Sequence, residues 1–494
     1  MLKKNTDLTH IISIHKFWQR LFCIVFITIA LNYKVSAADK ISDKPNIVLI
    51  LADDLGYNDL SCYREFITKQ SEEPPTCQTP SLDSLAKRGM LFTDFYAGAP
   101  VCSPSRAALL TGRNHCRTGI YNWIPKYTPM HLRSEEITIA EILRNNGYET
   151  GHFGKWHLTS EWNATTEEEM TQPRPNDQGF DYSFFTYNNA VPNHNNPTNF
   201  LRNGKPVGPL KGYACQLVVD EAIDWLDNKH DPDDPFYINV WFNEPHLKLA
   251  APEELTKRHK YNSKYYGAIE NMDIAVGRLI KKLNEMGMLN NTIIIFSSDN
   301  GSKWNHSNDP LRGKKGLTYE GGICEPFIVS WPGFVPEGTV SNYPASFTDI
   351  LPTLCEATSS KIPEDRKIDG VNILPVFIGE KDSVEREIPI FFFRYSNDPI
   401  CMLRIDNWCL LGYRDKSNAD SSSHSLAPGP FVQTHMELLK DLEPTYFELY
   451  DLKKDKEEKY NIIAEYQEQA QIMKTTMMKL RREVIIEGGD WFKE

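Results

Sequence analysis

Short apolar runs that alternate with helix-like segments are the feature that most constrains the fold of this 494-residue chain. Four runs have the length and apolar content of buried parallel strands: residues 46–52, 236–242, 292–298 and 326–331. Helical patterns lie between them, in residues 79–87, 138–145, 213–226 and 266–286. This alternation predicts an α/β fold with a mainly parallel central sheet flanked by helices.

A smaller α+β unit is expected at the C-terminal end, in residues 388–494. Antiparallel strands are predicted in residues 389–393, 402–405, 408–412 and 447–452, and an amphipathic helix in residues 461–482. Residues 417–430 form a polar break between the third and fourth of these strands. By contrast, residues 160–203 are rich in Asn, Pro and Thr, and we expect a long irregular insertion near the active face.

The N-terminus has the pattern of an export signal over residues 1–37. Basic residues precede an apolar run at 21–31, and Val35-Ser36-Ala37 offers a small-residue cleavage site. A retained signal anchor is the alternative, but the run is short for a membrane span. We therefore expect an exported protein with no stable membrane span after cleavage, in a periplasmic, extracellular or lysosomal compartment depending on the host.

Export implies an oxidising compartment, in which cysteines form disulfides. The chain has ten cysteines, and Cys401 and Cys409 are close enough in sequence to suggest a local bridge. The formal net charge is −12. This balance argues against a nucleic-acid partner, because such binding needs a net basic face.

Two predicted strands end in acidic or amide pairs. Asp53 and Asp54 follow the strand at 46–52, and Asp299 and Asn300 follow the strand at 292–298. Ligands bind at the carboxyl ends of parallel strands. Two such pairs at one edge predict an all-oxygen site for calcium or magnesium rather than zinc. Acidic pairs after strands also serve as turn residues, which is the alternative.

Cys102 lies at the expected N-terminus of a helix. Ser103 suits the N-cap, Pro104 the first helical position and Gly112 the C-terminal stop. A helix N-terminus favours anions, and Arg106 follows one turn later. This arrangement predicts a nucleophile beside an anion site. A disulfide cysteine is the alternative.

Three further segments carry cationic side chains that suit an oxyanion. Lys155 and His157 are two residues apart and would face the same way in an extended segment. His246 follows the strand at 236–242, where proton transfer is well placed. Lys315 lies in a basic, glycine-punctuated loop. Each signal is weak alone, since structural histidines and solvated lysines are common.

Taken together, these segments closely resemble the sulfatase family of the alkaline-phosphatase-like fold, over roughly residues 45–460. The resemblance is nearest to arylsulfatases and N-acetylgalactosamine-6-sulfatases. It rests on Asp53-Asp54, Cys102-Ser-Pro-Ser-Arg106 through Thr111-Gly112-Arg113, Gly154-Lys155-Trp156-His157, Pro245-His246, Ser298-Asp299-Asn300-Gly301, Lys315-Gly316 and Glu448-Leu449-Tyr450-Asp451-Leu452. Residues 38–387 would then be the catalytic domain and residues 388–494 the family's C-terminal subdomain.

The resemblance implies a sulfuric ester hydrolase that removes sulfate from a sulfated carbohydrate. A formylglycine-generating maturation enzyme would oxidise Cys102, and Asp53, Asp54, Asp299 and Asn300 would hold calcium, with residue 102 completing the shell. Arg106 would support the nucleophile. The resemblance assigns sulfate binding to Lys155 and Lys315, protonation of the leaving oxygen to His246, and release of sulfate to His157. Lys315 is chosen over the adjacent Lys314 because it directly precedes the matching Gly316.

Other functions remain open at this point, among them a glycosidase that uses a pair of carboxylates. A phosphodiesterase or phosphonate hydrolase of the same fold would act on a similar tetrahedral oxyanion. A non-catalytic exported binding protein would have Cys102 in a disulfide and would hold no metal. The sugar, its linkage position and the oligomeric state do not follow from these residues.

Overall fold

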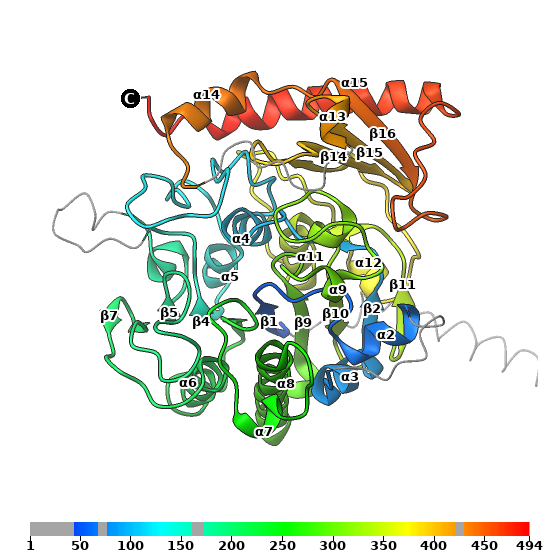
Figure 1. Ribbon diagram of the computed structural model, residues 1–494. Coiled ribbons are helices and arrows are strands. Elements are labelled where there is room, and N and C mark those ends of the chain that lie inside the picture. The colour runs from blue at the N-terminus through cyan, green and yellow to red at the C-terminus, as the bar shows by residue number, and fades with distance from the viewer. Residues whose placement is uncertain (1–43, 68–76, 161–171, 420–428, 494) are drawn as a thin grey trace, which may run out of the picture. The chain divides into compact units, whose positions relative to one another are not determined.

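Ten strands form the central sheet of the computed structural model, which describes residues 44–67, 77–160, 172–419 and 429–493 (Figure 1). β1 (Asn46–Ala52) lies within this sheet and pairs in parallel with β8 (Phe236–Trp241) and β9 (Thr292–Ser298). Every residue of these three strands is buried, as in parallel sheets covered on both faces. The predicted α/β class is confirmed. The predicted signal at 1–37 lies outside the described residues.

Six of the ten strands of this sheet were not predicted, and β4 (Glu149–Lys155) and β5 (Tyr182–Thr186) are the longest of them. The strand order is β11-β2-β10-β9-β1-β8-β4-β5-β6-β7, and β4 and β5 extend its parallel part. β5 lies in the interval 160–203 that we expected to be irregular. All five of its residues are buried, but its Asn- and Pro-rich surroundings hide this short run in the sequence.

The predicted direction of one strand was wrong. β10 (Phe327–Ser330) is buried as expected, but it pairs antiparallel with both β9 and β2 (Met90–Phe92). An apolar run shows that a strand is buried and carries no information on its direction. The remaining strands are β3 (Phe95–Tyr96), β6 (Leu201–Arg202), β7 (Lys205–Pro206), β11 (Thr339–Ser341) and β12 (Ala345–Ser346).

Helices lie on both sides of the sheet (Figure 1). Four confirm the predicted helical segments: α3 (Pro80–Lys87), α5 (Ile139–Asn145), α6 (Ala214–Asn228) and α8 (Ser263–Glu285). Thr138 caps α5 in a capping box with Glu141. The other helices of this part are α2 (Ser61–Ile67), α4 (Cys102–Thr111), α7 (Glu253–Thr256), α9 (Asn305–Asn308), α10 (Glu320–Ile323), α11 (Ile350–Ala357) and α12 (Leu374–Phe377).

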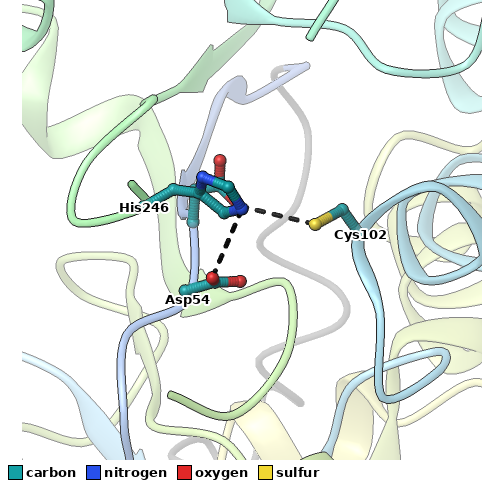
Figure 2. Close-up of side chains that lie close together, drawn as sticks. Asp54, Cys102 and His246 are labelled. Carbon is teal, nitrogen blue, oxygen red and sulfur yellow. Dashed lines mark hydrogen bonds and ion pairs between the residues drawn. The ribbon is translucent and has the colours of Figure 1, made fainter. Parts of the chain in front are cut away.

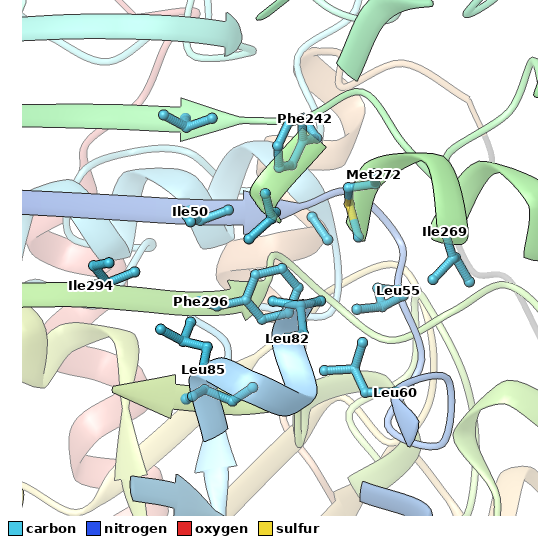
Figure 3. Close-up of a cluster of buried hydrophobic side chains, with 14 of the residues drawn as sticks. Ile50, Leu55, Leu60, Leu82, Leu85, Phe242, Ile269, Met272, Ile294 and Phe296 are labelled. Atoms are coloured by element: carbon cyan, nitrogen blue, oxygen red, sulfur yellow. The ribbon is translucent and has the colours of Figure 1, made fainter. Parts of the chain in front are cut away.

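One part of the core joins α3 and α8 to the sheet. Figure 3 shows Ile50 and Phe296, from neighbouring strands, together with Leu82 of α3 and Met272 of α8. All four side chains are at most 1% exposed. Their burial stabilises the packing of these two helices, by about 1.5–3 kcal/mol for each large apolar side chain. This packing holds β1 and β9 in place, and with them the acidic pairs that follow their carboxyl ends.

The C-terminal part is a separate antiparallel sheet, as predicted. β13 (Ile390–Phe393), β14 (Cys401–Ile405), β15 (Trp408–Tyr413) and β16 (Tyr446–Asp451) pair in chain order. The long helix α15 (Gln467–Gly488) contacts three of these strands. It begins later than the predicted residue 461, because the Ile462 N–H first donates to the Leu449 carbonyl beside β16. The short helices α13 (Lys416–Ala419) and α14 (Gln433–Asp441) complete this part.

The expected bridge between Cys401 and Cys409 is wrong. Cys401 pairs with Gly412, whereas Cys409 pairs with Arg404, three residues along β14. Because side chains alternate between faces along a strand, the two thiols point to opposite faces of the sheet. The cysteines of the described residues are all free thiols. No helix of the described residues has the length and apolar content needed to cross a membrane.

Candidate active site

The register of β1 against β9 brings the two acidic pairs together. Ala52 lies opposite Ser298, so Asp53 and Asp299 leave the strands side by side. The Asp54 N–H donates to Asp299 Oδ1 at 3.2 Å, and Asn300 Nδ2 donates to Asp54 Oδ1 at 2.8 Å. All four side chains are buried. The predicted meeting of these residues at one sheet edge is therefore what the structure shows.

α4 delivers Cys102 to the same edge. The helix begins at Cys102 itself, with Val101 as an extended N-cap, so the predicted N-cap at Ser103 was wrong. The Ser103 hydroxyl instead accepts the Ile124 N–H at 3.0 Å. Gly112 ends the helix in the left-handed conformation, as expected. The Cys102 sulfur lies 3.6 Å from Asp53 Oδ1, and the residue is 3% exposed.

Arg106 and Lys155 compensate the buried carboxylates. Arg106 Nη2 lies 2.8 Å from Asp299 Oδ2 and 3.9 Å from Asp53 Oδ1, and its Nη1 donates to the Lys155 carbonyl at 2.7 Å. Lys155, the last residue of β4, contacts Asp53 Oδ2 through its ammonium at 2.7 Å. The Arg106 guanidinium also lies over the Trp241 ring, 5.2 Å from its centroid. These contacts fix the positions of the Arg106 and Lys155 side chains.

Lys315 and His246 both contact Asp54, the second residue of the first acidic pair. The Lys315 ammonium contacts Asp54 Oδ1 and lies 3.5 Å from the Cys102 sulfur, which supports the choice of Lys315 over Lys314. His246 Nε2 lies 3.5 Å from Asp54 Oδ2. Figure 2 shows the imidazole facing both Asp54 and Cys102, and potential ligand atoms of Asp53, Asp54, Cys102 and His246 lie within 4.8 Å of one another.

His157 is buried near this cluster in an unexpected conformation. Its φ of 56° is left-handed, so it does not continue the extended run from Lys155 and the two do not simply share a face. Its Nε2 lies 3.0 Å from the Ile124 carbonyl and donates to it, while Nδ1 has no hydrogen-bond partner among the described residues. Burial, with the charges of Lys155 and Arg106, lowers the pKa of His157 well below its usual value. The neutral ring therefore offers a free acceptor.

Electrostatics keep Asp53 ionised and Cys102 neutral. Burial opposes the charge of Asp53, but Lys155, His246 and Arg106 together hold its pKa well below the usual value. Burial raises the pKa of the Cys102 thiol to about 12, although Lys155 and Lys315 act in the opposite direction. The thiol is therefore protonated at neutral pH. Since the thiolate is the nucleophilic form of cysteine, unmodified Cys102 is a poor nucleophile.

The residues fit a bound divalent cation. Asp53, Asp54 and Asp299 supply carboxylate oxygens, and Asn300 Oδ1 is buried without a hydrogen-bond partner among the described residues. A buried amide oxygen left unpaired is costly, and a cation would satisfy it. Burial and the charge of Asp53 raise the pKa of Asp299, although Arg106 and Lys155 act in the opposite direction.

Two residues at this edge were missed in the sequence. The Glu244 carbonyl accepts the Asp53 N–H at 2.9 Å, and Glu244 Oε1 lies 3.9 Å from Nδ1 of the fully buried His194. His194 also interacts electrostatically with His246 and Asp53. It lies in the interval 160–203, where nothing in the local pattern distinguishes one polar residue from another. Glu244 and His194 are therefore part of the immediate surroundings of His246 and Asp53.

Comparison with known proteins places these features in a family. The Sulfatase family model matches residues 45–360. The chain is 34% identical to N-acetylgalactosamine-6-sulfatase of Rattus norvegicus, over 71% of this chain and 68% of that protein. It is 31% identical to arylsulfatase A of Homo sapiens, over 87% of this chain and 85% of that protein.

A solved structure agrees over most of the chain. The crystal structure of Ps i-CgsB in complex with k-i-k-neocarrahexaose has a TM-score of 0.73 and 28% sequence identity, and the match covers 89% of this chain and 93% of that one. The matched family model includes all the site residues described above. The chain therefore belongs to the Sulfatase family and is a sulfuric ester hydrolase.

Proposed function

We propose that this sulfuric ester hydrolase removes sulfate from a carbohydrate, with a formylglycine made from Cys102 and a calcium ion held by Asp53, Asp54, Asp299 and Asn300. One observation carries the proposal. The Cys102 sulfur lies at a helix N-terminus between a carboxylate of the acidic cluster and the Lys315 ammonium, 3.6 Å and 3.5 Å away. A nucleophilic atom at this position has both metal ligands and an oxyanion-binding cation beside it.

The metal assignment rests on the donor atoms. Three carboxylates and one amide oxygen form a hard ligand set, which calcium prefers over softer ligands, and magnesium accepts similar donors. His246 is near this cluster through Nε2, but a nitrogen ligand suits zinc rather than calcium. A bound cation of this kind supplies positive charge that polarises the nucleophile and the ester oxygen.

The side chain of residue 102 would be modified before it acts. A buried protonated thiol is a poor nucleophile, whereas the hydrate of an aldehyde places a hydroxyl where the sulfur now lies. The oxidation requires an external oxidant and a maturation enzyme, which are the partners we propose for this step. The second hydroxyl of the hydrate would later expel sulfate, with the unpaired His157 Nδ1 as the acceptor of its proton.

The remaining residues divide between binding and proton transfer. Lys155 and Lys315 would contact sulfate oxygens and offset the charge that develops on them. Arg106 contacts Asp299 and the Lys155 carbonyl, and so keeps these two residues in position beside the nucleophile. His246 is 19% exposed at its side chain and faces Cys102, so it can reach a leaving oxygen and donate a proton to it.

A sulfated sugar is the substrate class that the relatives support. One similar structure holds an oligosaccharide, and one relative is named for a sulfated amino sugar. A sugar alcohol is a poor leaving group, so a proton donor such as His246 suits it. Export from the cytoplasm, predicted from residues 1–37, would bring the protein to periplasmic, extracellular or lysosomal polysaccharides, depending on the host.

Peptide mass spectrometry across Cys102, on protein from its native host, tests the nucleophile first. We expect the mass of formylglycine, together with turnover of a sulfated monosaccharide that exceeds turnover of the matching phosphate ester. A disulfide at Cys102 would refute the proposal. Faster turnover of the phosphate ester would instead favour the phosphodiesterase alternative.

A further inference from the structure

Arg394, directly after β13, is a buried arginine whose charge has no carboxylate partner among the residues that the structure describes. It is 8% exposed. Its buried counterparts in the described chain all have such partners: Arg106 with Asp299, Arg113 with Glu136, Arg117 with Asp369, Arg404 with Asp94 and Arg481 with Glu443. A buried charge without a counter-ion destabilises the folded state. Arg394 therefore fits an anion that the described chain does not provide.

The guanidinium lies beside the loop that supplies Lys315. A Cβ placed on Gly316 would be 4.0 Å from Arg394 Nη2. Gly316 is held on both sides, since its N–H donates to the Pro100 carbonyl at 2.8 Å and its carbonyl accepts from Asn397 Nδ2 at 2.7 Å. Pro100 is two residues before Cys102, so Arg394 lies at the border of the site, next to Lys315.

Unpartnered polar atoms gather in the segment that follows β13. Arg394 Nε and the Ser396 hydroxyl are both buried without a hydrogen-bond partner among the described residues. Burial lowers the pKa of Arg394 to about 10, with Tyr395 and Cys102 acting in the opposite direction, so the side chain is still charged at neutral pH. Cys102 is thus among the groups close enough to act on Arg394. A planar guanidinium matches two oxygens of a carboxylate or sulfate.

We propose that Arg394 binds a second anionic group of the substrate, a carboxylate or a second sulfate, next to the sulfate ester that is hydrolysed. The inference rests on the proposed function in one respect, that the substrate is a sulfated carbohydrate. Lys155 and Lys315 contact Asp53 and the Cys102 sulfur, whereas Arg394 lies beside Gly316, the residue after Lys315. It is therefore a specificity residue, which selects sugars that carry two negative charges.

Three substrates test this assignment in wild-type protein and in Arg394→Met and Arg394→Lys. They are a monosulfated neutral monosaccharide, a disulfated monosaccharide and a monosulfated disaccharide with a uronic acid. We expect Arg394→Met to lower kcat/KM roughly 100-fold for one of the two dianionic sugars and less than about threefold for the monoanionic one. The affected sugar identifies the second group as sulfate or carboxylate. The kcat/KM of Arg394→Lys should lie between the values of wild type and Arg394→Met. Lysine keeps the positive charge but lacks the planar guanidinium, which can donate two parallel hydrogen bonds.

Arg482→Gln is the matched control, because its side chain is 65% exposed on α15, and it should match wild type on all three sugars. Thermal unfolding separates specificity from structure. Removal of an uncompensated charge should leave the melting temperature of Arg394→Met equal to or above that of wild type. A lower melting temperature with equal losses on all three sugars would overturn the inference, as would unchanged kinetics.

Binding keeps this test independent of turnover. The affinities of the mono- and dianionic sugars can be measured by calorimetry on Cys102→Ala and on Cys102→Ala with Arg394→Met. We expect the second variant to lose its preference for a dianionic sugar, and retention of that preference refutes the role of Arg394. If wild type binds these sugars without hydrolysing any sulfate ester, the proposed function fails while the role of Arg394 is still decided.

Discussion

At the carboxyl ends of β1 and β9, charged side chains are buried together, whereas the C-terminal sheet buries mainly apolar ones. Asp53 and Asp299 are fully buried and contact residues from distant parts of the chain. In the C-terminal sheet, β13 to β16 pair in chain order around fully buried side chains such as Met402 and Leu411. Buried charge costs folding free energy and buried apolar surface stabilises. The sheet edge is therefore arranged for chemistry, and the C-terminal sheet is arranged for stability.

This difference predicts how substitutions divide their effects. Changes at the sheet edge should act mainly on activity, and changes within the C-terminal sheet should act mainly on stability. Four experiments test the division.

Cys102→Ala should have the largest effect, a loss of roughly 10⁴-fold or more in kcat, because it removes the proposed nucleophile. Its melting temperature should stay near that of wild type, since alanine suits the first position of α4. Turnover of a sulfated sugar and thermal unfolding are the measurements. Cys355→Ala in α11 is the control, because this cysteine is also buried and lies outside the site. Wild-type activity in Cys102→Ala would exclude the mechanism.

Chelation of the proposed calcium ion should lower activity about 10³-fold, and added calcium should restore it, because the cation would polarise the reacting groups. Asp299→Ala should give a similar loss that calcium does not restore. Bound metal is measured by elemental analysis of the purified protein. If Asp299→Ala keeps its metal and unfolds instead, the acidic cluster is structural.

Leu411→Ala should lower the free energy of unfolding by about 2–5 kcal/mol, because it leaves a cavity in the C-terminal sheet. Activity per folded molecule should stay within about twofold of wild type. Denaturant unfolding and active-site titration measure the two quantities. A large loss of kcat in fully folded protein would show that the C-terminal sheet positions catalytic groups, and the comparison between the two regions would fail.

Lys315→Ala should lower kcat/KM roughly 100-fold, because its ammonium contacts Asp54 and the Cys102 sulfur. Lys314→Ala, one residue earlier, is the matched control and should change kcat/KM less than about twofold. Steady-state kinetics on one sulfated sugar gives kcat/KM for both variants and shows which lysine acts on the substrate. Equal losses would mean that the loop acts as a whole rather than through one lysine.

Some corrections show where local pattern stops being informative. β10 is apolar and buried as predicted, but its antiparallel pairing depends on β9 and β2, which lie elsewhere in the chain. β5 is short and lies among Asn and Pro residues, so only its place beside β4 identifies it as a strand. Cys401 and Cys409 are near in sequence, yet strand register sends them to opposite faces. Direction, neighbours and register are properties of pairs of strands.

The candidate site was predictable to a larger extent because its residues lie at ends of regular elements. Asp53, Asp299 and His246 follow buried strands, and Cys102 begins a helix whose C-terminal glycine stop is visible in the sequence. These positions depend on local patterns of burial and capping. The roles of Lys155 and Lys315 at this site were predicted from the family resemblance and not from periodicity.

The sequence by itself determined the α/β class, the strands that carry the acidic pairs and the helix that presents Cys102, because apolar periodicity and capping are local. Only the tertiary structure decided that Glu244 and His194 lie near Asp53 and that His157 has a left-handed conformation. It also decided that, among the described residues, His157 Nδ1 has no hydrogen-bond partner and Arg394 has no carboxylate partner. The reason is physical. The charge state and partners of a buried group depend on every segment packed around it, and those segments meet only when the chain has folded.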